Sequence, residues 1–132
     1  MNHFVFFLPL VAVLSVVTLA LAQALEARRL RSQTPEEQKS IALLRSWLTP
    51  EQLDQWNTRE EFEVIGGDTG TRYCITYGTV MNVHQLDHNG KPFAQWCFRP
   101  EGKLAVGDVL LAQKIALENM ERRSLALANS QA

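Results

Sequence analysis

The chain has 132 residues, enough for one domain. Its formal net charge is −1 and 20% of its residues are charged, so it lacks the basic surface that nucleic acid requires. Two cysteines do not make a disulfide framework. An apolar N-terminal run raises the hydrophobic fraction to 46%. We therefore expect one small domain after that run, with no nucleic-acid partner and no cofactor.

Residues 4–22 carry no charge and form the most apolar part of the chain. This length is close to the ~20 residues that cross ~30 Å of hydrocarbon as a helix. The first three residues of the chain contain no Lys or Arg, whereas an export signal normally begins with a basic region. The pattern predicts a retained transmembrane helix in contact with lipid, marked by Phe4, Leu8, Val13, Val17 and Ala22.

Three juxtamembrane arginines follow the apolar run, namely Arg28, Arg29 and Arg31. Positive charge is retained on the cytoplasmic side of a membrane, so the rest of the chain is predicted to be cytoplasmic. Residues 1–32 are then the anchor and its short stalk, and residues 33–132 are the domain. Small-residue sites also allow signal cleavage near Ala22 or Ala24, which would give an exported domain instead.

Two helix starts share one pattern, because TPEE begins at Thr34 and TPEQ begins at Thr49. Thr at the N-cap, Pro at the first helical position and an acid or amide three residues on form a capping box. We predict helices over 35–48 and 50–57. Their expected core residues are Ile41, Leu44, Trp47 and Leu48 on the first, and Leu53 and Trp56 on the second.

The segment 60–98 is rich in β-forming residues and is divided by turn sequences. It predicts four strands, over 61–66, 71–77, 80–86 and 93–98. Residues 99–107 are predicted as a loop, Asp108 as an N-cap and 109–128 as a long helix. That helix should bury the face of Leu111, Ala112, Ile115, Ala116 and Met120.

The predicted fold class is therefore α+β, with an N-terminal transmembrane helix, two short helices, a four-stranded antiparallel meander and a long C-terminal helix on one sheet face. The turn at Asn89-Gly90 predicts that His84 pairs with Gln95 and that Asn82 pairs with Cys97. A three-residue turn around Gly78 would place Tyr73, Ile75 and Tyr77 in the core.

That register gathers polar side chains on the uncovered sheet face, and these are the candidate site residues: Arg72, Cys74, Asn82, His84, Gln95 and Cys97. A whole strand separates the two cysteines, at ~9.5 Å, which is too far for a disulfide. The spacing of the cysteines and histidines does not suit zinc. A Cys97 nucleophile with His84 as its base would lack an orienting group. We predict neither a metal site nor a catalytic site.

The sequence GGDTGTR at 66–72 has some likeness to a phosphate-binding loop. A strand follows it where such a loop requires a helix, so we interpret it as a hairpin turn.

The segments LTPEQ, NVHQLDHNG and CFRPEGKLAVGDVLLAQKIALE resemble a group of small, uncharacterised bacterial domains. Those domains pair a short β-meander with a C-terminal helix that opens G-D-x-x-L-A-Q-K. The resemblance covers residues 48–128 and implies one domain, but it brings no activity and no functional residue.

These patterns together predict a single-pass membrane protein whose domain is not an enzyme and acts as an interaction module for a protein partner. The predicted contact surface is the polar sheet face or the edge strand 61–66. The alternatives are the exported binding domain and a thiol- or metal-dependent site on the polar face.

Overall fold

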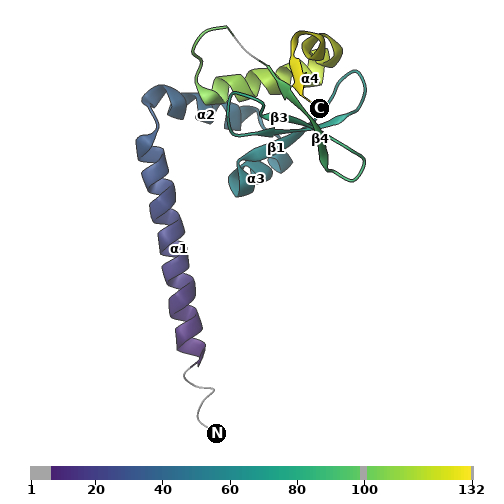
Figure 1. Cartoon of the computed structure of the whole chain (residues 1–132). Coiled ribbons are helices and arrows are strands. Elements are labelled where there is room, and N and C mark those ends of the chain that lie inside the picture. The colour runs from purple at the N-terminus through teal and green to yellow at the C-terminus, as the bar shows by residue number, and fades with distance from the viewer. Residues whose placement is uncertain (1–6, 99–100, 132) are drawn as a thin grey trace. The chain divides into compact units, whose positions relative to one another are not determined.

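The computed structural model describes residues 7–98 and 101–131. The chain divides into two compact units, residues 1–38 and 39–132. The first contains helix α1 (Phe7–Ser32) and the start of α2 (Pro35–Trp47). The second contains everything that follows, and it is the folded domain of the protein (Figure 1).

Helix α1 corrects the prediction made for the N-terminal run. No helix in the described part of the chain is long and apolar enough to cross a membrane. This finding overturns the predicted transmembrane helix, and with it the single-pass, signal-anchored arrangement and the cytoplasmic membrane location.

The structure describes some, but not all, of the residues predicted to mark that span. Phe4 lies outside the described residues, whereas Leu8, Val13, Val17 and Ala22 lie in α1. The arginines at 28, 29 and 31 also lie in α1, so the predicted helical stalk does form a continuous helix with the apolar run. Signal cleavage within this helix stays a prediction.

Both predicted capping threonines begin a helix. The Thr34 hydroxyl accepts the Glu37 N–H at 3.2 Å at the start of α2. Thr49 forms the complete capping box of α3 (Pro50–Arg59), because its hydroxyl accepts the Gln52 N–H and the Gln52 side chain accepts the Thr49 N–H. Helix α3 ends at Glu60, which takes the left-handed conformation and turns the chain into the sheet.

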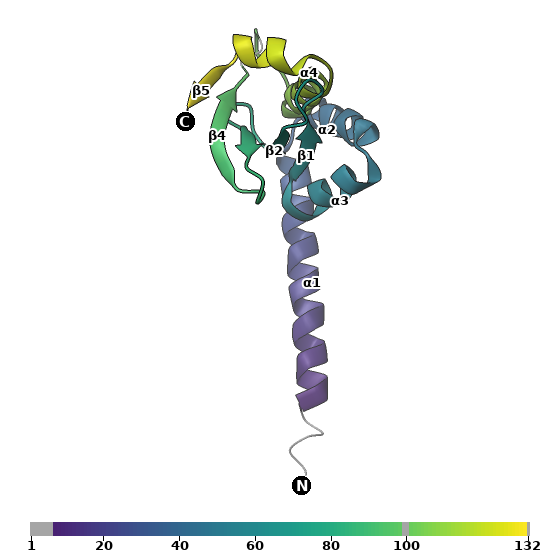
Figure 2. The same ribbon diagram turned by 90° about the vertical axis from the view of Figure 1, so that its right-hand side faces the viewer.

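The sheet is antiparallel and its strands are neighbours in chain order. The four predicted strands form, and a short fifth strand at the C-terminus joins the edge of the fourth. Figure 2 shows β4 and β5 curving away from β1 and β2. The strands are β1 (Glu61–Ile65), β2 (Arg72–Thr76), β3 (Val83–Leu86), β4 (Pro92–Cys97) and β5 (Asn129–Gln131).

The connection between β2 and β3 is longer than predicted. Thr76 N–H bonds the Asn82 carbonyl at 2.9 Å, so residues 77–82 form the loop and β3 starts at Val83. The predicted pair His84 and Gln95 is confirmed. The longer loop uses a positive φ at Met81 as well as at Gly78, which a three-residue turn did not include.

Helix α4 (Val106–Leu127) begins three residues before the predicted position, and Asp108 lies in its first turn instead of capping it. Gly107 allows α4 to lie close to α2, because a Cβ there would lie 2.3 Å from the Ser40 carbonyl carbon in α2. The Gly107 N–H bonds the Ser40 hydroxyl at 3.2 Å. Met120 has non-helical angles and kinks α4.

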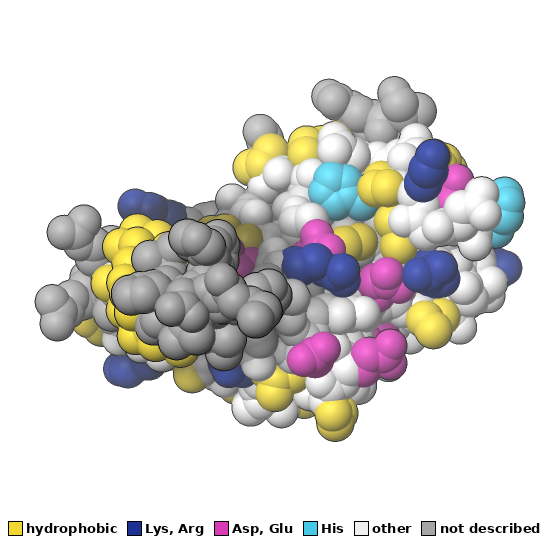
Figure 3. All heavy atoms as spheres, turned by 90° about the horizontal axis from the view of Figure 1, so that it is seen from below, with side chains coloured by type: hydrophobic (Ala, Val, Ile, Leu, Met, Phe, Trp, Pro, Cys, Tyr) yellow, Lys and Arg dark blue, Asp and Glu magenta, His cyan; other side chains and the backbone are white. Residues whose placement is uncertain are grey.

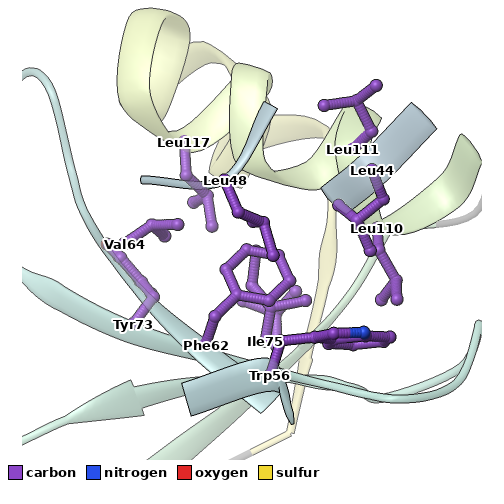
Figure 4. Packing of buried hydrophobic residues seen from close by; sticks show 11 residues of the cluster. Leu44, Leu48, Trp56, Phe62, Val64, Tyr73, Ile75, Leu110, Leu111 and Leu117 are labelled. Atoms are coloured by element: carbon purple, nitrogen blue, oxygen red, sulfur yellow. The ribbon is translucent and has the colours of Figure 1, made fainter. Parts of the chain in front are cut away.

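The core lies between the sheet and helices α2, α3 and α4 (Figure 4). Tyr73 and Ile75 are buried as predicted, and so is Trp56 of α3. Trp47 is 57% exposed, which corrects its assignment to the core. The labelled side chains in Figure 4 come from α2 (Leu44), the link between α2 and α3 (Leu48), α3 (Trp56), the first two strands (Phe62, Val64, Tyr73, Ile75) and α4 (Leu110, Leu111, Leu117).

Helix α4 buries a different face from the one predicted. Leu111 is buried, but Ala112, Ile115 and Met120 are exposed. The buried face is formed by Val109, Leu110, Leu111, Gln113, Lys114, Leu117 and Glu121. Each buried polar side chain on this face has a partner, and the described residues contain no buried side-chain donor or acceptor left without one. Hydrogen bonds therefore allow α4 to bury a face that contains polar side chains, although hydrophobicity alone would favour burial of a more apolar face.

Candidate interaction surface

The predicted polar face forms in part, as one row of side chains across three strands. Cys74 in β2 pairs with His84 in β3, and His84 pairs with Gln95 in β4, so the three share one face of the sheet. His84 Nδ1 lies 3.3 Å from Gln95 Nε2. Arg72 is exposed two residues before Cys74, and its Nη2 donates to Glu63 Oε2 at 2.8 Å.

Asn82 and Cys97 are not part of this row. Asn82 is 3% exposed and exchanges two hydrogen bonds with the Gln113 amide of α4, at 2.8 and 2.9 Å. Cys97 is buried and pairs with Asn129 of β5. Strand β3 separates the strands of the two cysteines, and both thiols are free. The structure thus brings together four of the six predicted residues.

The surroundings of Cys74 oppose thiol chemistry on this face. Burial raises the pKa of the Cys74 thiol to about 12, and the negative charges of Glu61 and Glu63 act in the same direction. The thiolate is the form that attacks substrates and binds metals. Within residues 7–98 and 101–131, no three His, Cys, Asp or Glu side chains are grouped to hold a metal ion.

The turn between β1 and β2 encloses a carboxylate that α4 supplies. Glu121 is 0% exposed. Its Oε2 accepts the backbone N–H groups of Asp68 at 2.9 Å and Thr69 at 2.8 Å. Its Oε1 accepts the Tyr73 hydroxyl at 2.7 Å and also the Thr69 hydroxyl. A Cβ at Gly66 would lie 2.2 Å from the carboxylate carbon, so the turn can close around this group only with glycine there.

These donors hold Glu121 in its ionised form. Burial by itself raises the pKa of Glu121, but the hydrogen bonds from Thr69, Tyr73 and Asp68 outweigh burial and lower this pKa overall. The pKa of Tyr73 is raised, first by burial and then by the bond to the carboxylate. Neutral hydrogen-bond donors therefore stabilise the buried charge.

This cluster also explains the likeness of residues 66–72 to a phosphate-binding loop. The predicted hairpin turn is confirmed, because Gly66 N–H bonds the Thr71 carbonyl at 2.8 Å and β1 pairs with β2. Successive N–H groups aimed at one oxygen form an anion-binding concavity. The anion here is the chain's own Glu121, so the turn fastens α4 to the sheet.

An apolar groove lies along α4 beside its buried face, and the buried residues Val109 and Gln113 are among the residues that line it. Its volume is about 210 Å³. Residues on both sides of the Met120 kink line it, so the bend in α4 makes the surface concave. Gln113 and Ser124 are its polar lining residues. The apolar lining is Phe98, Val109, Ala112, Ala116, Leu127 and Ala128.

The same helix carries exposed apolar side chains, of which Leu127 lines the groove. Leu127 is 82% exposed, Met120 is 47% exposed and Ile115 is 36% exposed. Contiguous exposed apolar patches on soluble proteins mark interaction sites when they are large. This is the candidate interaction surface of the domain.

A second hollow, of about 310 Å³, lies beside α3 and the first two strands. Most of its lining residues are polar, and three of the charged ones form ion pairs: Arg72 with Glu63, and Glu118 with Lys114. On the face drawn in Figure 3, Lys and Arg side chains lie next to Asp and Glu side chains. Charges of both signs are mixed there, so this face offers no field of one sign to attract a charged ligand.

The edge of β1, which was the other predicted contact surface, is already occupied at its centre. Gln52 of α3 donates its Nε2 to the Glu63 carbonyl at 2.8 Å. Gln55 accepts the Glu63 N–H through its Oε1, also at 2.8 Å. Another strand could pair here only by displacing both amides, so β1 is a protected edge.

Neither the groove nor the Glu121 cluster was predicted. The apolar content of the faces of α4 favoured a core position for Ala112 and Ala116. The spacing of Leu110, Lys114, Leu117 and Glu121 follows one helix face. The Glu121 cluster could have been predicted from this spacing only if the segment GGDTG had also been identified as the partner of an acidic side chain.

Comparisons with protein families, curated proteins and solved structures find no match to this chain. The resemblance of residues 48–128 to small bacterial domains stays a prediction. Evidence on function therefore comes from the surfaces of the domain itself.

Proposed function

We propose that residues 39–132 form a non-catalytic protein-interaction module and that the α4 groove is its contact surface. The observation that carries this proposal is the second apolar face of α4. One face is buried against the sheet, whereas the face with Ala112 and Leu127 is exposed and concave. An amphipathic helix in a domain this small normally has one apolar face.

The size of the groove favours a protein side chain as its occupant over a free small molecule. Ligand pockets usually enclose about 300–1,000 Å³ and bury most of the ligand. At about 210 Å³ this groove is smaller. A shallow apolar groove with few polar lining groups suits one or two apolar side chains of a partner, which other contacts would hold in place.

The remaining surfaces support a catalytic function less well than the groove supports an interaction function. The polar sheet face offers a protonated Cys74 and a His84 bonded to Gln95. The Glu121 carboxylate is fully used inside the fold. An interaction function is therefore the proposal that the described side chains support best.

The test is site-specific photo-crosslinking in the native host, with the crosslinking amino acid at Leu127. We expect one protein to be captured repeatedly and to be lost when Ala112→Arg places a charged side chain in the groove. Asn119→Arg is the matched control, because it adds the same charge to an exposed position of α4 that does not line the groove. Equal crosslinking in both variants would contradict the proposal.

A further inference from the structure

Helix α4 changes direction at Met120, although its own sequence gives no reason for a bend. Its green half and its yellow half run in different directions in both ribbon views (Figure 1, Figure 2). Sharp kinks almost always arise at proline, at Gly/Ser pairs, or where another group inserts into the hydrogen bonds of the helix. Residues 112–124 contain neither proline nor glycine. The cause therefore lies in what α4 contacts.

The turn at 66–70 bonds the backbone of α4 on both sides of the bend. In a continuous α-helix each N–H donates to the carbonyl four residues before it. Here the Leu117 carbonyl accepts the Gly67 N–H at 3.0 Å, and the Arg122 N–H donates to Asp68 Oδ2 at 2.9 Å. Asp68 thus caps the second half of α4 as an N-cap residue would, from 54 positions away in the chain.

The turn can approach the helix this closely only with glycine at position 67. A Cβ there would lie 2.0 Å from the Glu118 carbonyl oxygen. Glu121 completes a reciprocal contact, because its carboxylate accepts two N–H groups of the turn while the carboxylate of Asp68 accepts an N–H of the helix. Charge-assisted hydrogen bonds are roughly twice as strong as neutral ones, so these contacts can outweigh the internal bonds of a straight helix.

The bend also brings together the residues that line the groove. The Ser124 hydroxyl donates to the Ala116 carbonyl at 3.4 Å. Residues eight positions apart in a straight helix are separated by ~12 Å along its axis. Both residues line the groove, so the two halves of α4 approach each other on its side. Straightening α4 would move Ser124 and Leu127 away from Ala116 and remove the concave surface.

We propose that the turn at 66–70 sets the bend of α4 and thereby forms the groove. Gly67 and Asp68 are then positioning residues for the contact surface, although they are not among the residues that line it. Helix α4 has two states, a bent state that carries the groove and a straight state that does not. The partner binds the bent state, so the contacts between the turn and α4 regulate its affinity. This inference rests on the proposed interaction function and adds the regulation of that surface.

The experiment compares four full-length chains by NMR: the wild type, Gly67→Ala, Asp68→Ala and Asp87→Ala. The last is the matched control, because Asp87 stabilises a different turn by accepting the N–H groups of Asn89 and Lys91 at 2.8 and 2.9 Å. The measured quantity is the ¹³Cα chemical shift of Met120, which differs between helical and non-helical backbone angles and requires no partner. Crosslinking through Leu127 is then measured in the same four chains.

We expect a non-helical Met120 shift in the wild type and in Asp87→Ala, and a change toward the helical value in Gly67→Ala and Asp68→Ala. Loss of one charge-assisted hydrogen bond should change the ratio of bent to straight α4 by roughly tenfold or more. Crosslinking should fall in the same two variants and persist in Asp87→Ala. Cooperative thermal unfolding shows that each chain folds, and if Gly67→Ala does not fold, Asp68→Ala decides the test.

A Met120 shift that stays non-helical in the folded turn variants would overturn the inference, and the packing of Leu125 against the core would then explain the bend. A helical shift with undiminished crosslinking would also overturn it, because the groove would not depend on the bend. Absence of any crosslinked partner in the wild type would instead count against the proposed function, while the Met120 shift would still decide whether the turn sets the bend.

Discussion

Replacing Glu121 tests whether the turn at 66–70 fastens α4 to the sheet. In Glu121→Gln the side chain keeps its shape but loses its charge. Its remaining carbonyl oxygen can accept the N–H groups of Asp68 and Thr69, and its new NH₂ can donate to the hydroxyls of Thr69 and Tyr73. Charged hydrogen bonds contribute ~1.5–3 kcal/mol each and neutral ones ~0.5–1.5 kcal/mol, so we expect a loss of about 2 kcal/mol.

Glu121→Ala should cost more. It removes all four hydrogen bonds and leaves the Tyr73 hydroxyl and two backbone N–H groups without their acceptor. A buried unsatisfied group costs ~1–3 kcal/mol, so the expected loss is about 5 kcal/mol, comparable to the whole stability of a small domain. Urea unfolding at pH 7 measures both variants. A Gln variant as stable as wild type, or an Ala variant more stable than the Gln variant, would refute this reasoning.

The pH dependence gives a second test of the same group. The folded-state pKa of Glu121 is lowered relative to the unfolded chain. Its contribution to stability is therefore present above the unfolded value of about 4.3 and is lost as the pH falls through the folded pKa. The difference in unfolding free energy between wild type and Glu121→Gln should shrink in that acid range. If this difference in unfolding free energy stays constant from pH 7 to pH 3, the charge of Glu121 does not contribute to its binding by the turn.

Three further predictions follow from buried contacts. Gly107→Ala should lower the free energy of unfolding by about 1–3 kcal/mol, because its Cβ would meet the Ser40 backbone; an unchanged thermal midpoint would contradict this close crossing. Asn82→Ala should cost about 1–3 kcal/mol, since it leaves the Gln113 amide unsatisfied. The double variant Asn82→Ala/Gln113→Ala should cost less than the sum of the single variants, and additivity in a double-mutant cycle would show that the amides are not coupled. Cys74 should react with iodoacetamide at pH 8 at least about tenfold more slowly in the folded chain than in urea, because its pKa is raised to about 12; equal rates would contradict that environment.

The local elements of the domain could be predicted from the sequence because their causes are local. The two Thr-Pro pairs begin helices through bonds within four residues. The turn at 66–71 and the pairing of His84 with Gln95 depend on neighbouring glycines and on alternation. The candidates Arg72, Cys74, His84 and Gln95 also share a face, as alternation required.

Long-range polar contacts decided the rest. The orientation of α4 depends on bonds between residues about fifty positions apart, such as Tyr73 with Glu121, and no periodicity within the helix encodes them. The same contacts expose Ala112 and so create the groove. Asn82 lies in the core and not on the predicted surface, because the amide of the distant Gln113 forms hydrogen bonds with the Asn82 amide. Apolar patterning estimates the cost of burying a polar group in isolation, and only the assembled fold supplies the partner that removes this cost.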